Sequence, residues 1–541
     1  MRRSLGTFES LLWRNDSARV LNAAPAVCGE YLAKILTSQV YDVAHETSMQ
    51  SATTLTSSLN NEIFLKREDT QPVFSFKIRG AYNKIANLPK DLLDKGVIAC
   101  SAGNHAQGVA LSARKLQIPA TIVMPVATPS IKVKAVRRHG GEYTKVVLHG
   151  STFDEASVEA TRLMIEEGLT LIHPFDDPDV IAGQGTVGME ILRKFNAKPL
   201  DAIFVCTGGG GLLAGVAAAV KSLRPEVQVI GVEADDAAGM TTSLREGKVT
   251  TLSQVGLFAD GAAVRTIGSN TFDICSKVVD GMITVSTDEI CAAIKHGFNE
   301  TRCVMEPAGA LGIAGMIKFI KLNNWTDKTC VAITSGANID FDRLRFVSER
   351  ADSSEAMFSV TIPDRPGTFR DLYSLIHPRN VTEFSFRTRI NSNGPMDANV
   401  IISFQAKSGT DIFDDKKEVA ERLMSQGFKC TDLSDNELAK AHARHMSGGR
   451  AGLKEELLFR FEFPESPGAL NKFLKTMDRH NDDKWNISLW HYRNCGHDVG
   501  RVLVGVEVRK EDRENFDVFL KNLNYKYHEE TDNIIYEQFL L

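Results

Sequence analysis

The chain has 541 residues and a formal net charge of −5; hydrophobic residues make up 43% of it and charged residues 24%. This balance is typical of a globular protein that buries a full core, and the length allows two to four domains at roughly 150 residues each. The weak negative charge, without a long basic run, argues against nucleic acid or an anionic membrane surface as the main partner. The nine cysteines show no C-x-x-C spacing, so we expect neither a disulfide framework nor a metal site, and a reducing intracellular compartment.

Residues 1–29 precede any recognisable domain. They carry several arginines but lack the apolar core of a secretory signal. Two interpretations stay open, because Glu9 and Asp16 are unusual in an otherwise arginine-rich transit peptide. A transit peptide would place the protein in a plastid or mitochondrion, and an untargeted tail would leave it in the cytoplasm.

From about residue 60 to 345, within a predicted domain of residues 30–350, short apolar runs alternate with helical patterns. The predicted strand and helix pairs are 63–66 with 80–86, 96–100 with 106–116, 121–124 with 130–138, and 203–205 with 212–223, followed by strands at 229–233 and 330–334. Such alternation predicts an α/β domain with a mostly parallel sheet. A site in this fold lies at the carboxyl ends of the strands.

After a short polar linker, the sequence contains an internal repeat. The first copy opens with residues 357–369 and the second with residues 458–470, about 100 residues later. The recurring residues are Phe358, Pro363, Pro366 and Gly367, matched by Phe459, Pro464, Pro467 and Gly468. Each copy reads as a strand, a Pro-Gly turn and a helix, so we predict two α+β modules, over residues 355–435 and 455–541.

Four segments of the first domain carry candidate chemistry. The first, SFKIRGA at residues 75–81, places Lys77 at the start of a helix among apolar neighbours. A desolvated amine has a lowered pKa and can form a Schiff base. Taken alone, an ordinary surface lysine is the commoner explanation.

The second segment, SAGNHAQG at residues 101–108, places small residues at a helix start, where backbone N–H groups and the helix dipole favour a carboxylate. The fourth, TSGAN at residues 334–338, follows a buried strand, and the hydroxyl of Ser335 could bond a heterocyclic nitrogen. A structural helix cap is an open alternative for both.

The third segment contains four consecutive glycines, residues 208–211. Without side chains the backbone can wrap a phosphate with its N–H groups. An alternative is the dinucleotide fingerprint of an NAD-dependent dehydrogenase, with Gly209, Gly211 and Ala214 as its small residues and Glu233 as its acid. That alternative explains neither the contiguous glycines nor the other three segments.

Together the four segments resemble the fold-type II pyridoxal-phosphate (PLP) enzymes, which share the fold of the tryptophan synthase β subunit. KRED at residues 66–69, EPAGA at residues 306–310 and the doubled C-terminal module make the chain similar to the biosynthetic threonine dehydratase (threonine deaminase) family, from about residue 30 to 541. One departure is Thr-Ser-Met at residues 47–49, where the family usually has Thr-Pro-Leu. It concerns the fit of the substrate and not the chemistry.

The resemblance implies a role for each matching residue. Lys77 would carry PLP and act as the base, with Ser335 as the second catalytic residue. The implied cofactor contacts are Phe76 on the ring, Asn104 on the ring hydroxyl, Gly208, Gly209, Gly210, Gly211 and Leu212 around the phosphate, and Ser335 at the ring nitrogen. The implied contacts to the substrate carboxylate are Ser101, Gly103, Asn104 and His105.

The resemblance also implies a reaction and its regulation. The enzyme would dehydrate and deaminate threonine to 2-oxobutanoate and ammonia, the first step of isoleucine biosynthesis, with serine as a secondary substrate. It would be a homo-oligomer, a tetramer, whose ACT-like modules bind isoleucine as inhibitor and valine as antagonist. Aromatic residues on matched strands would wall an apolar effector cleft: Phe384, Phe386, Trp490 and Tyr492. A purely structural dimerisation region is the alternative.

Other functions share parts of this pattern. Serine dehydratase and serine racemase have all four segments, but in their usual form they lack the duplicated C-terminal region. A non-catalytic amino-acid sensor would not need an intact set of Lys77, Asn104, glycine loop and Ser335.

Overall fold

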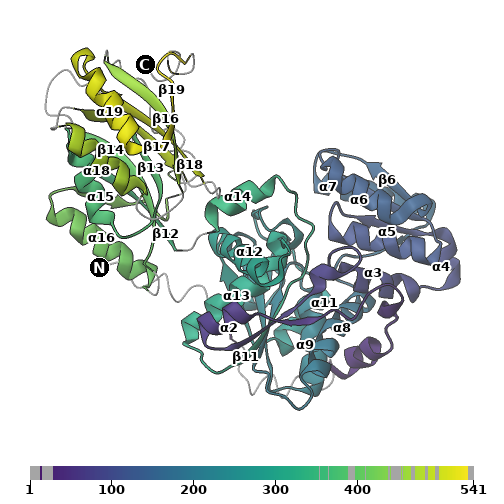
Figure 1. Ribbon diagram of the computed structural model, residues 1–541. Helices are drawn as coiled ribbons and strands as arrows, with labels where there is room; N and C mark the ends of the chain where they lie inside the picture. The colour runs from purple at the N-terminus through teal and green to yellow at the C-terminus, as the bar shows by residue number, and fades with distance from the viewer. Residues whose placement is uncertain are drawn as a thin grey trace. The chain divides into compact units, whose positions relative to one another are not determined.

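The computed structural model divides the chain into two compact units, Met1–Asp352 and Ser353–Leu541 (Figure 1). The structure describes residues 13–14, 28–351, 354–363, 365–387, 397–407, 410–436, 455–464, 469–481, 485–493 and 499–533, together with residues 439, 453 and 536. Most of the predicted N-terminal segment 1–29 lies outside these residues, as do Pro467 and Gly468 of the repeat.

The larger sheet of the first unit has seven strands. In spatial order they are β1 (Trp13–Arg14), β10 (Gly281–Val285), β9 (Gln228–Ala234), β8 (Ala202–Cys206), β11 (Thr329–Ile333), β3 (Glu62–Lys66) and β2 (Met49–Ser51). The five central strands are parallel, and the two edge strands run antiparallel to their neighbours. This is the mostly parallel sheet that the sequence predicts.

A second sheet of four parallel strands belongs to the same unit. Its order is β6 (Thr144–Leu148), β5 (Ala120–Met124), β4 (Val97–Cys100) and β7 (Thr170–Leu171). The helices of the unit are α2 (Thr53–Leu59), α3 (Lys77–Ala86), α4 (Lys90–Lys95), α5 (Asn104–Leu116), α6 (Ser130–Gly140), α7 (Phe153–Glu167), α8 (Pro178–Lys194), α9 (Gly211–Leu223), α10 (Gly239–Glu246), α11 (Ser269–Val278), α12 (Thr287–Thr301), α13 (Pro307–Asn323) and α14 (Arg343–Arg350).

Helices cover both faces of the larger sheet. Ile203 and Val205 of β8 belong to a buried cluster with α8 and α9, whereas Phe204 and its neighbours at 202 and 206 belong to a cluster with α12 and α13. Alternate residues of a strand point to opposite faces, so a strand buried on both faces must be apolar throughout. This explains why the central strands appear in the sequence as short continuous apolar runs.

The second unit is one antiparallel sheet of eight strands. Their order is β15 (Lys429–Asp432), β12 (Glu355–Pro363), β14 (Asp397–Gln405), β13 (Val381–Arg387), β17 (Asn486–Arg493), β18 (Val499–Glu507), β16 (Glu456–Pro464) and β19 (Lys526–Glu529). Helices α15 (Thr368–Ile376), α16 (Ile412–Ser425), α18 (Ala469–Asn481) and α19 (Arg513–Leu523) pack against it in a single hydrophobic core.

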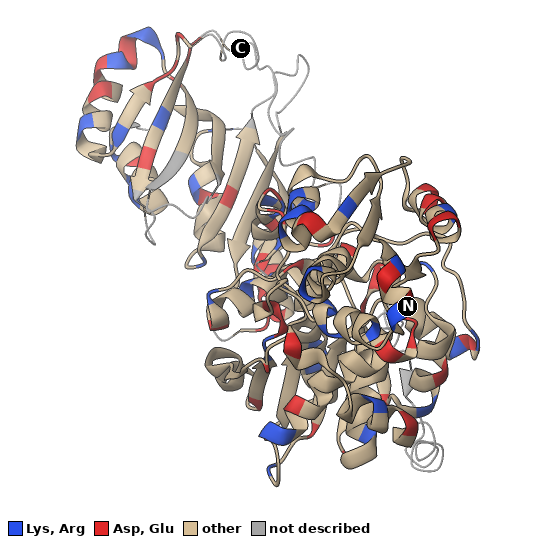
Figure 2. Cartoon of the chain, turned by 90° about the vertical axis from the view of Figure 1, so that its right-hand side faces the viewer, with Lys and Arg blue, Asp and Glu red and all other residues tan. Residues whose placement is uncertain are grey.

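The two halves of this unit repeat the same β-α-β-β-α-β order. They join through β13 and β17, where Phe386 pairs with Trp490 and Phe384 pairs with Tyr492. The predicted fold class is therefore confirmed: a parallel-sheet α/β domain followed by two α+β modules. Acidic and basic residues are interspersed along the helices of both units (Figure 2). Among the described residues, no helix combines the length and apolar character that a membrane crossing requires.

Candidate active site and regulatory pocket

The four segments with candidate chemistry each follow a parallel strand. Lys77 follows β3, Asn104 follows β4, the glycine loop follows β8 and Ser335 follows β11. β8, β11 and β3 are neighbours in the larger sheet, and a backbone bridge joins Ser75 to Gly336. The structure thus gathers the segments at the carboxyl ends of the strands, where α/β folds place their sites.

Lys77 is the first residue of α3, and its Nζ donates a hydrogen bond to the carbonyl oxygen of Pro174 at 2.8 Å. Removal from solvent lowers the pKa of this amine to about 8, although the nearby Cys206 and Glu306 oppose the shift. Burial disfavours the charged form of an amine. A substantial neutral fraction is therefore present near neutral pH, as a nucleophile or base requires.

Asn104, the first residue of α5, is held by two side chains. Its Nδ2 donates to Oε1 of Glu306 at 2.6 Å, and its Oδ1 accepts from Nδ2 of Asn338 at 2.7 Å. Burial raises the pKa of Glu306 to about 7. The amide is thus fixed in one orientation, and its second N–H has no acceptor among the residues that the structure describes.

The remaining residues of the second segment surround the start of α5. The N–H of Gly103 donates to Oγ of Ser101 at 3.3 Å. His105 is buried, with Nε2 2.7 Å from the carbonyl oxygen of Ile172, so this nitrogen carries the proton. Burial, assisted by the charge of Lys77, lowers the pKa of His105 to about 3. The imidazole is therefore neutral and offers no positive charge to a carboxylate. A carboxylate bound here would interact with the backbone N–H groups and the dipole at the start of α5.

The glycine loop leads directly into α9. A Cβ added at Gly209 would lie 2.3 Å from the ring of Phe175, and one at Gly210 would lie 2.6 Å from Cε of Met240. Gly210 also has a φ of 96°, which side-chain-bearing residues rarely adopt. The N–H groups of residues 208–211 donate no hydrogen bond to the other residues that the structure describes, so they are available to a ligand.

The geometry does not favour a dinucleotide. Glu233 is fully buried, and its carboxylate accepts from the N–H of Met240 at 2.7 Å, the N–H of Thr241 at 2.8 Å and the hydroxyl of Thr241 at 2.6 Å. An acid that binds a ribose must be exposed at the end of its strand. Glu233 instead holds the start of α10.

Ser335 lies directly after β11 and is buried. Its Oγ donates to the carbonyl oxygen of Ala308 at 3.2 Å, and its own carbonyl oxygen accepts from the N–H of Phe76 at 3.2 Å. The thiol of Cys206 interacts with this hydroxyl, and burial raises the pKa of the thiol to about 12. Ser335 thus lies beside a neutral thiol.

These groups fit PLP. Lys77 offers a partly neutral amine, Asn104 an oriented amide with one unused N–H, the glycine loop a set of N–H groups for a phosphate, and Ser335 a buried neutral hydroxyl. Oγ of Ser75, beside Phe76, is buried without a hydrogen-bond partner in the described residues.

A buried ion network escaped the sequence analysis. The guanidinium of Arg79 contacts Glu68 at 2.7 Å and Glu190 at 2.6 Å, and Nζ of Lys66 reaches Glu190 and the carbonyl oxygen of Thr47. All four charges are buried and they balance in sign, which is the condition for a stable buried cluster. The network ties α3 to α8 and to residues 47–49. Lys66, Glu68 and Arg79 lie in the segments KRED and SFKIRGA of the sequence analysis, but no local pattern marked Glu190 as their partner.

Comparisons with known proteins agree with this geometry. Residues 40–336 match the family model of pyridoxal-phosphate dependent enzymes, and residues 348–443 and 447–540 match the C-terminal regulatory domain of threonine dehydratase. A biosynthetic L-threonine dehydratase of Burkholderia multivorans is 51% identical over 94% of this chain and 99% of its own length. The mitochondrial threonine dehydratase of Saccharomyces cerevisiae is 50% identical over 94% of this chain and 89% of its own.

The chain belongs to the biosynthetic threonine dehydratase family. It is a PLP-dependent lyase with a C-terminal regulatory region, as the sequence predicts. Among solved structures, the processed form of threonine deaminase isoform 2 from Solanum lycopersicum matches with a TM-score of 0.59 and 48% identity, over 63% of this chain and 97% of the other.

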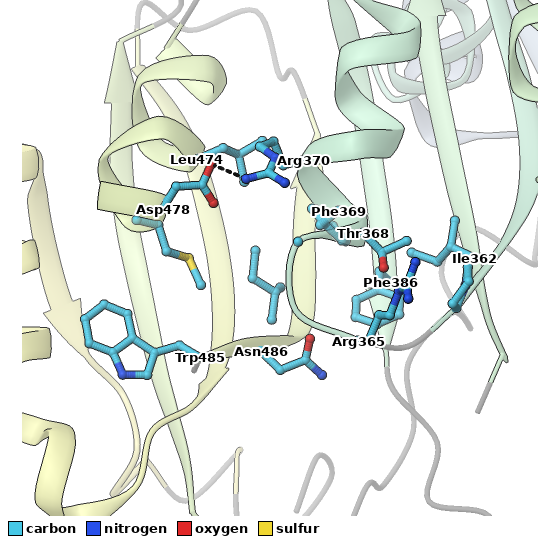
Figure 3. Close-up of a pocket in the computed structure, with 14 residues that line it drawn as sticks. Ile362, Arg365, Thr368, Phe369, Arg370, Phe386, Leu474, Asp478, Trp485 and Asn486 are labelled. Atoms are coloured by element: carbon cyan, nitrogen blue, oxygen red, sulfur yellow. Dashed lines mark hydrogen bonds and ion pairs between the residues drawn. The ribbon is translucent and has the colours of Figure 1, made fainter. Parts of the chain in front are cut away.

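The C-terminal regulatory region contains a pocket between its two halves (Figure 3). The pocket lies at the start of α15, where Thr368 follows Gly367, and Oγ1 of Thr368 is buried without a hydrogen-bond partner in the described residues. Arg370 of α15 and Asp478 of α18 form an ion pair of 2.9 Å at one side. Trp485 and Asn486 line the pocket from the second half.

The structure separates the four aromatic residues that we predicted to wall an effector cleft. Phe386 lines the pocket. Phe384 and Trp490 are fully buried in the core, where their rings lie 4.5 Å and 5.6 Å from the ring of Phe369, itself a lining residue. Tyr492 is partly buried and pairs with Phe384. Phe386 therefore contacts the pocket directly, and Phe384 and Trp490 lie behind it.

Proposed function

We propose that this enzyme converts L-threonine into 2-oxobutanoate and ammonia, as the first step of isoleucine synthesis, and that isoleucine inhibits it through the C-terminal modules. The observation that carries the proposal is the burial of the Lys77 amine at the start of α3, near enough to Glu306 for the charge of Glu306 to affect its pKa. Glu306 in turn bonds Asn104. This arrangement occurs in a chain that matches biosynthetic threonine dehydratases over nearly their whole length.

The proposed residues hold the cofactor from several sides. Lys77 attaches PLP covalently, Phe76 packs on its ring and Asn104 donates its unused N–H to the ring hydroxyl. Residues 208–212 bind the phosphate through backbone N–H groups. Ser335 bonds the ring nitrogen, and its neutral hydroxyl stabilises a protonated ring less than a carboxylate would.

The bound cofactor supplies an electron sink for the bonds that change at Cα. In the proposed reaction, Nζ of Lys77 would accept the α-proton of threonine once the amino group of the substrate has replaced it on the cofactor, and its lowered pKa suits the freed amine to this role. Loss of the β-hydroxyl as water leaves aminocrotonate, which adds water and releases 2-oxobutanoate and ammonia. Catalysis by Lys77 therefore needs the unprotonated amine.

The substrate carboxylate is proposed to bind at the start of α5, through Ser101, Gly103, Asn104 and His105. A Cβ added at Gly103 would meet no atom within 4 Å, so there is open space at this end of the helix. The single ring N–H of the neutral His105 is used on the carbonyl oxygen of Ile172, so His105 is proposed to contribute its backbone N–H at the start of α5. The positive end of the helix dipole supplies the attraction.

For regulation we propose that isoleucine binds in the pocket between the two C-terminal modules and that valine competes for it. The start of α15 and the unpaired hydroxyl of Thr368 suit the carboxylate and amino group of the effector, and Phe386 suits its branched side chain. Inhibition then requires that isoleucine bind a less active state more tightly.

The remaining proposals concern organisation. We propose domains at residues 30–350, 355–435 and 455–541, after an N-terminal segment of 29 residues, and a homotetramer. The compartment depends on that first segment and stays a prediction: plastid or mitochondrion with a transit peptide, cytoplasm without one.

One assay tests the function. The purified protein is given threonine or serine, and the 2-oxo acid and any D-serine are measured with and without isoleucine and valine. We expect faster turnover of threonine, inhibition by isoleucine and relief by valine. Preferred formation of D-serine, or turnover that isoleucine leaves unchanged, would contradict the catalytic and the regulatory proposal respectively. Serine racemases of maize and Dictyostelium discoideum share the catalytic fold at 31% and 32% identity. The assay therefore includes serine as a substrate and measures D-serine.

A further inference from the structure

The segment of residues 173–177, His-Pro-Phe-Asp-Asp, contacts both ends of the proposed cofactor site. The carbonyl oxygen of Pro174 accepts from Nζ of Lys77, and the ring of Phe175 lies directly against Gly209. Nδ1 of His173 accepts from the N–H of Phe175 at 3.3 Å and of Asp176 at 2.7 Å, which fixes the turn. Neither the sequence motifs nor the proposed catalytic roles account for Asp176.

The carboxylate of Asp176 caps α11 from outside the helix. It accepts from the N–H groups of Ser269 at 3.0 Å, Asn270 at 2.9 Å and Thr271 at 3.1 Å. These are the first three residues of the helix, whose N–H groups have no acceptor within it. A negative charge at this end is also stabilised by the helix dipole. Asp176 thus sets where α11 begins, and with it the position of Thr271.

Thr271 is fully buried and reaches back to the glycine loop. Its Oγ1 donates to the carbonyl oxygen of Gly209 at 2.7 Å, and the N–H of Gly268 donates to the same oxygen at 3.3 Å. In a trans peptide the carbonyl and the following N–H point in opposite directions. A Gly209 carbonyl held on the α11 side therefore turns the N–H of Gly210 to the opposite side, where the phosphate is proposed to bind.

We propose that Asp176 and Thr271 are positioning residues for the phosphate seat, the loop of residues 208–212 that is proposed to bind the PLP phosphate. Asp176 fixes the start of α11, and Thr271, held in place by that helix, orients the peptide between Gly209 and Gly210. The inference rests on the proposed role of the glycine loop in binding PLP. Neither side chain touches the phosphate. Their effect reaches the cofactor through a single backbone carbonyl, and Pro174 in the same segment holds the amine of Lys77.

The test measures how tightly the holoenzyme holds PLP, by equilibrium dialysis, and the environment of the cofactor phosphate, by ³¹P NMR. Thr271→Val keeps the volume but removes the hydroxyl, and we expect it to raise the dissociation constant of PLP about tenfold and to shift the phosphate signal. Thr271→Ser keeps the hydroxyl and should restore both values. A purely structural role of Thr271 would not move the phosphate signal.

Asp176→Ala should weaken PLP by a similar factor, and the double variant should be no weaker than the single ones, because both act through one carbonyl. Asp177→Ala is the control, since Asp177 also caps a helix, as the N-cap residue of α8, without touching α11. We expect it to leave the dissociation constant within about twofold. If Asp176→Ala does not fold, Asp176→Asn keeps one capping oxygen and should give an intermediate value.

The outcomes separate this inference from the proposed function. If Gly210→Val loses PLP while Thr271→Val and Asp176→Ala retain it with an unchanged phosphate signal, the positioning role is wrong and the phosphate seat stands. If Gly210→Val also retains PLP, the seat itself is wrong. Additive losses in the double variant would show that Asp176 does not act through Thr271.

Discussion

Asn104 and Glu306 lie 202 residues apart in the sequence, yet Nδ2 of Asn104 is 2.6 Å from Oε1 of Glu306. The contact joins the start of α5, beside the smaller sheet, to the start of α13, against the larger sheet. The residue proposed to bind the cofactor hydroxyl is thereby oriented by a buried carboxyl group with a pKa raised to about 7.

The raised pKa of Glu306 predicts a pH dependence. An acid whose pKa is higher in the folded state contributes stability below its ordinary pKa, and loses that contribution as the pH rises through the folded value. Wild type should therefore lose thermal stability relative to Glu306→Gln as the pH is raised from about 5 to about 8. Unfolding temperatures of both proteins across this range measure it.

Glu233 provides the matched control, because burial also raises its pKa to about 7 and it does not contact Asn104. Glu233→Gln should show the same sign of change in stability. Only Glu306→Gln should alter the pH profile of kcat/KM with threonine near neutral pH. An identical change of profile in both variants would show that Glu306 does not act through Asn104.

Gly210 should be indispensable for retention of PLP. Gly210→Val strains a backbone with a φ of 96° and forces a side chain against Met240 and Thr271. The control is Gly247→Val, where the φ of 71° imposes similar strain but no atom lies within 4 Å of the added Cβ. We expect PLP loss on dialysis only for Gly210→Val. Equal retention in the two variants would contradict a phosphate seat at this loop.

We expect Ser335 to affect the reactivity of the bound cofactor but not its retention. Ser335→Ala removes the buried hydroxyl that bonds the carbonyl of Ala308, and in the proposed site it would leave the ring nitrogen of bound PLP unpaired. We expect PLP to stay bound, with kcat lowered at least about tenfold if roughly 1.4 kcal/mol of stabilisation is lost. A variant with wild-type kcat would show that another group bonds the ring nitrogen.

Isoleucine inhibition should depend on the pocket between the modules. Phe386→Asp places a charge on its apolar wall, and Thr368→Val removes the unpaired hydroxyl. Each should raise the isoleucine concentration for half inhibition at least about tenfold, equivalent to 1.4 kcal/mol of binding. Phe413→Asp, at an exposed site on α16 of the same unit, is the control. Inhibition unchanged in all three variants would place the effector site elsewhere.

Much of the catalytic domain could be predicted from the sequence. The strands β4, β8 and β11 are almost wholly buried on both faces, and β3 is buried in its second half, so they appear as short apolar runs, each followed by a chemically distinctive segment. The repeat likewise predicted two modules of the same order. Local patterns carry this information because parallel strands bring their carboxyl ends together.

Contacts between distant segments could not be predicted. Nothing local marks Glu306 as the partner of Asn104, or Asp176 as the cap of a helix that starts 93 residues later. The alternation of β13 indicates that Phe384 and Phe386 share a face, but not which of these two buried rings borders the pocket. That division depends on where Phe369 of α15 packs.

The most direct test of the account is covalent attachment of the cofactor to Lys77, measured by borohydride reduction of the holoenzyme and peptide mapping, with 2-oxobutanoate production from threonine followed in parallel. We predict that PLP is recovered on the peptide containing Lys77, and that Lys77→Ala folds but has neither the attached cofactor nor measurable turnover, because the anchor and the base are lost together. PLP recovered on another lysine, or near-wild-type turnover by Lys77→Ala, would contradict the account.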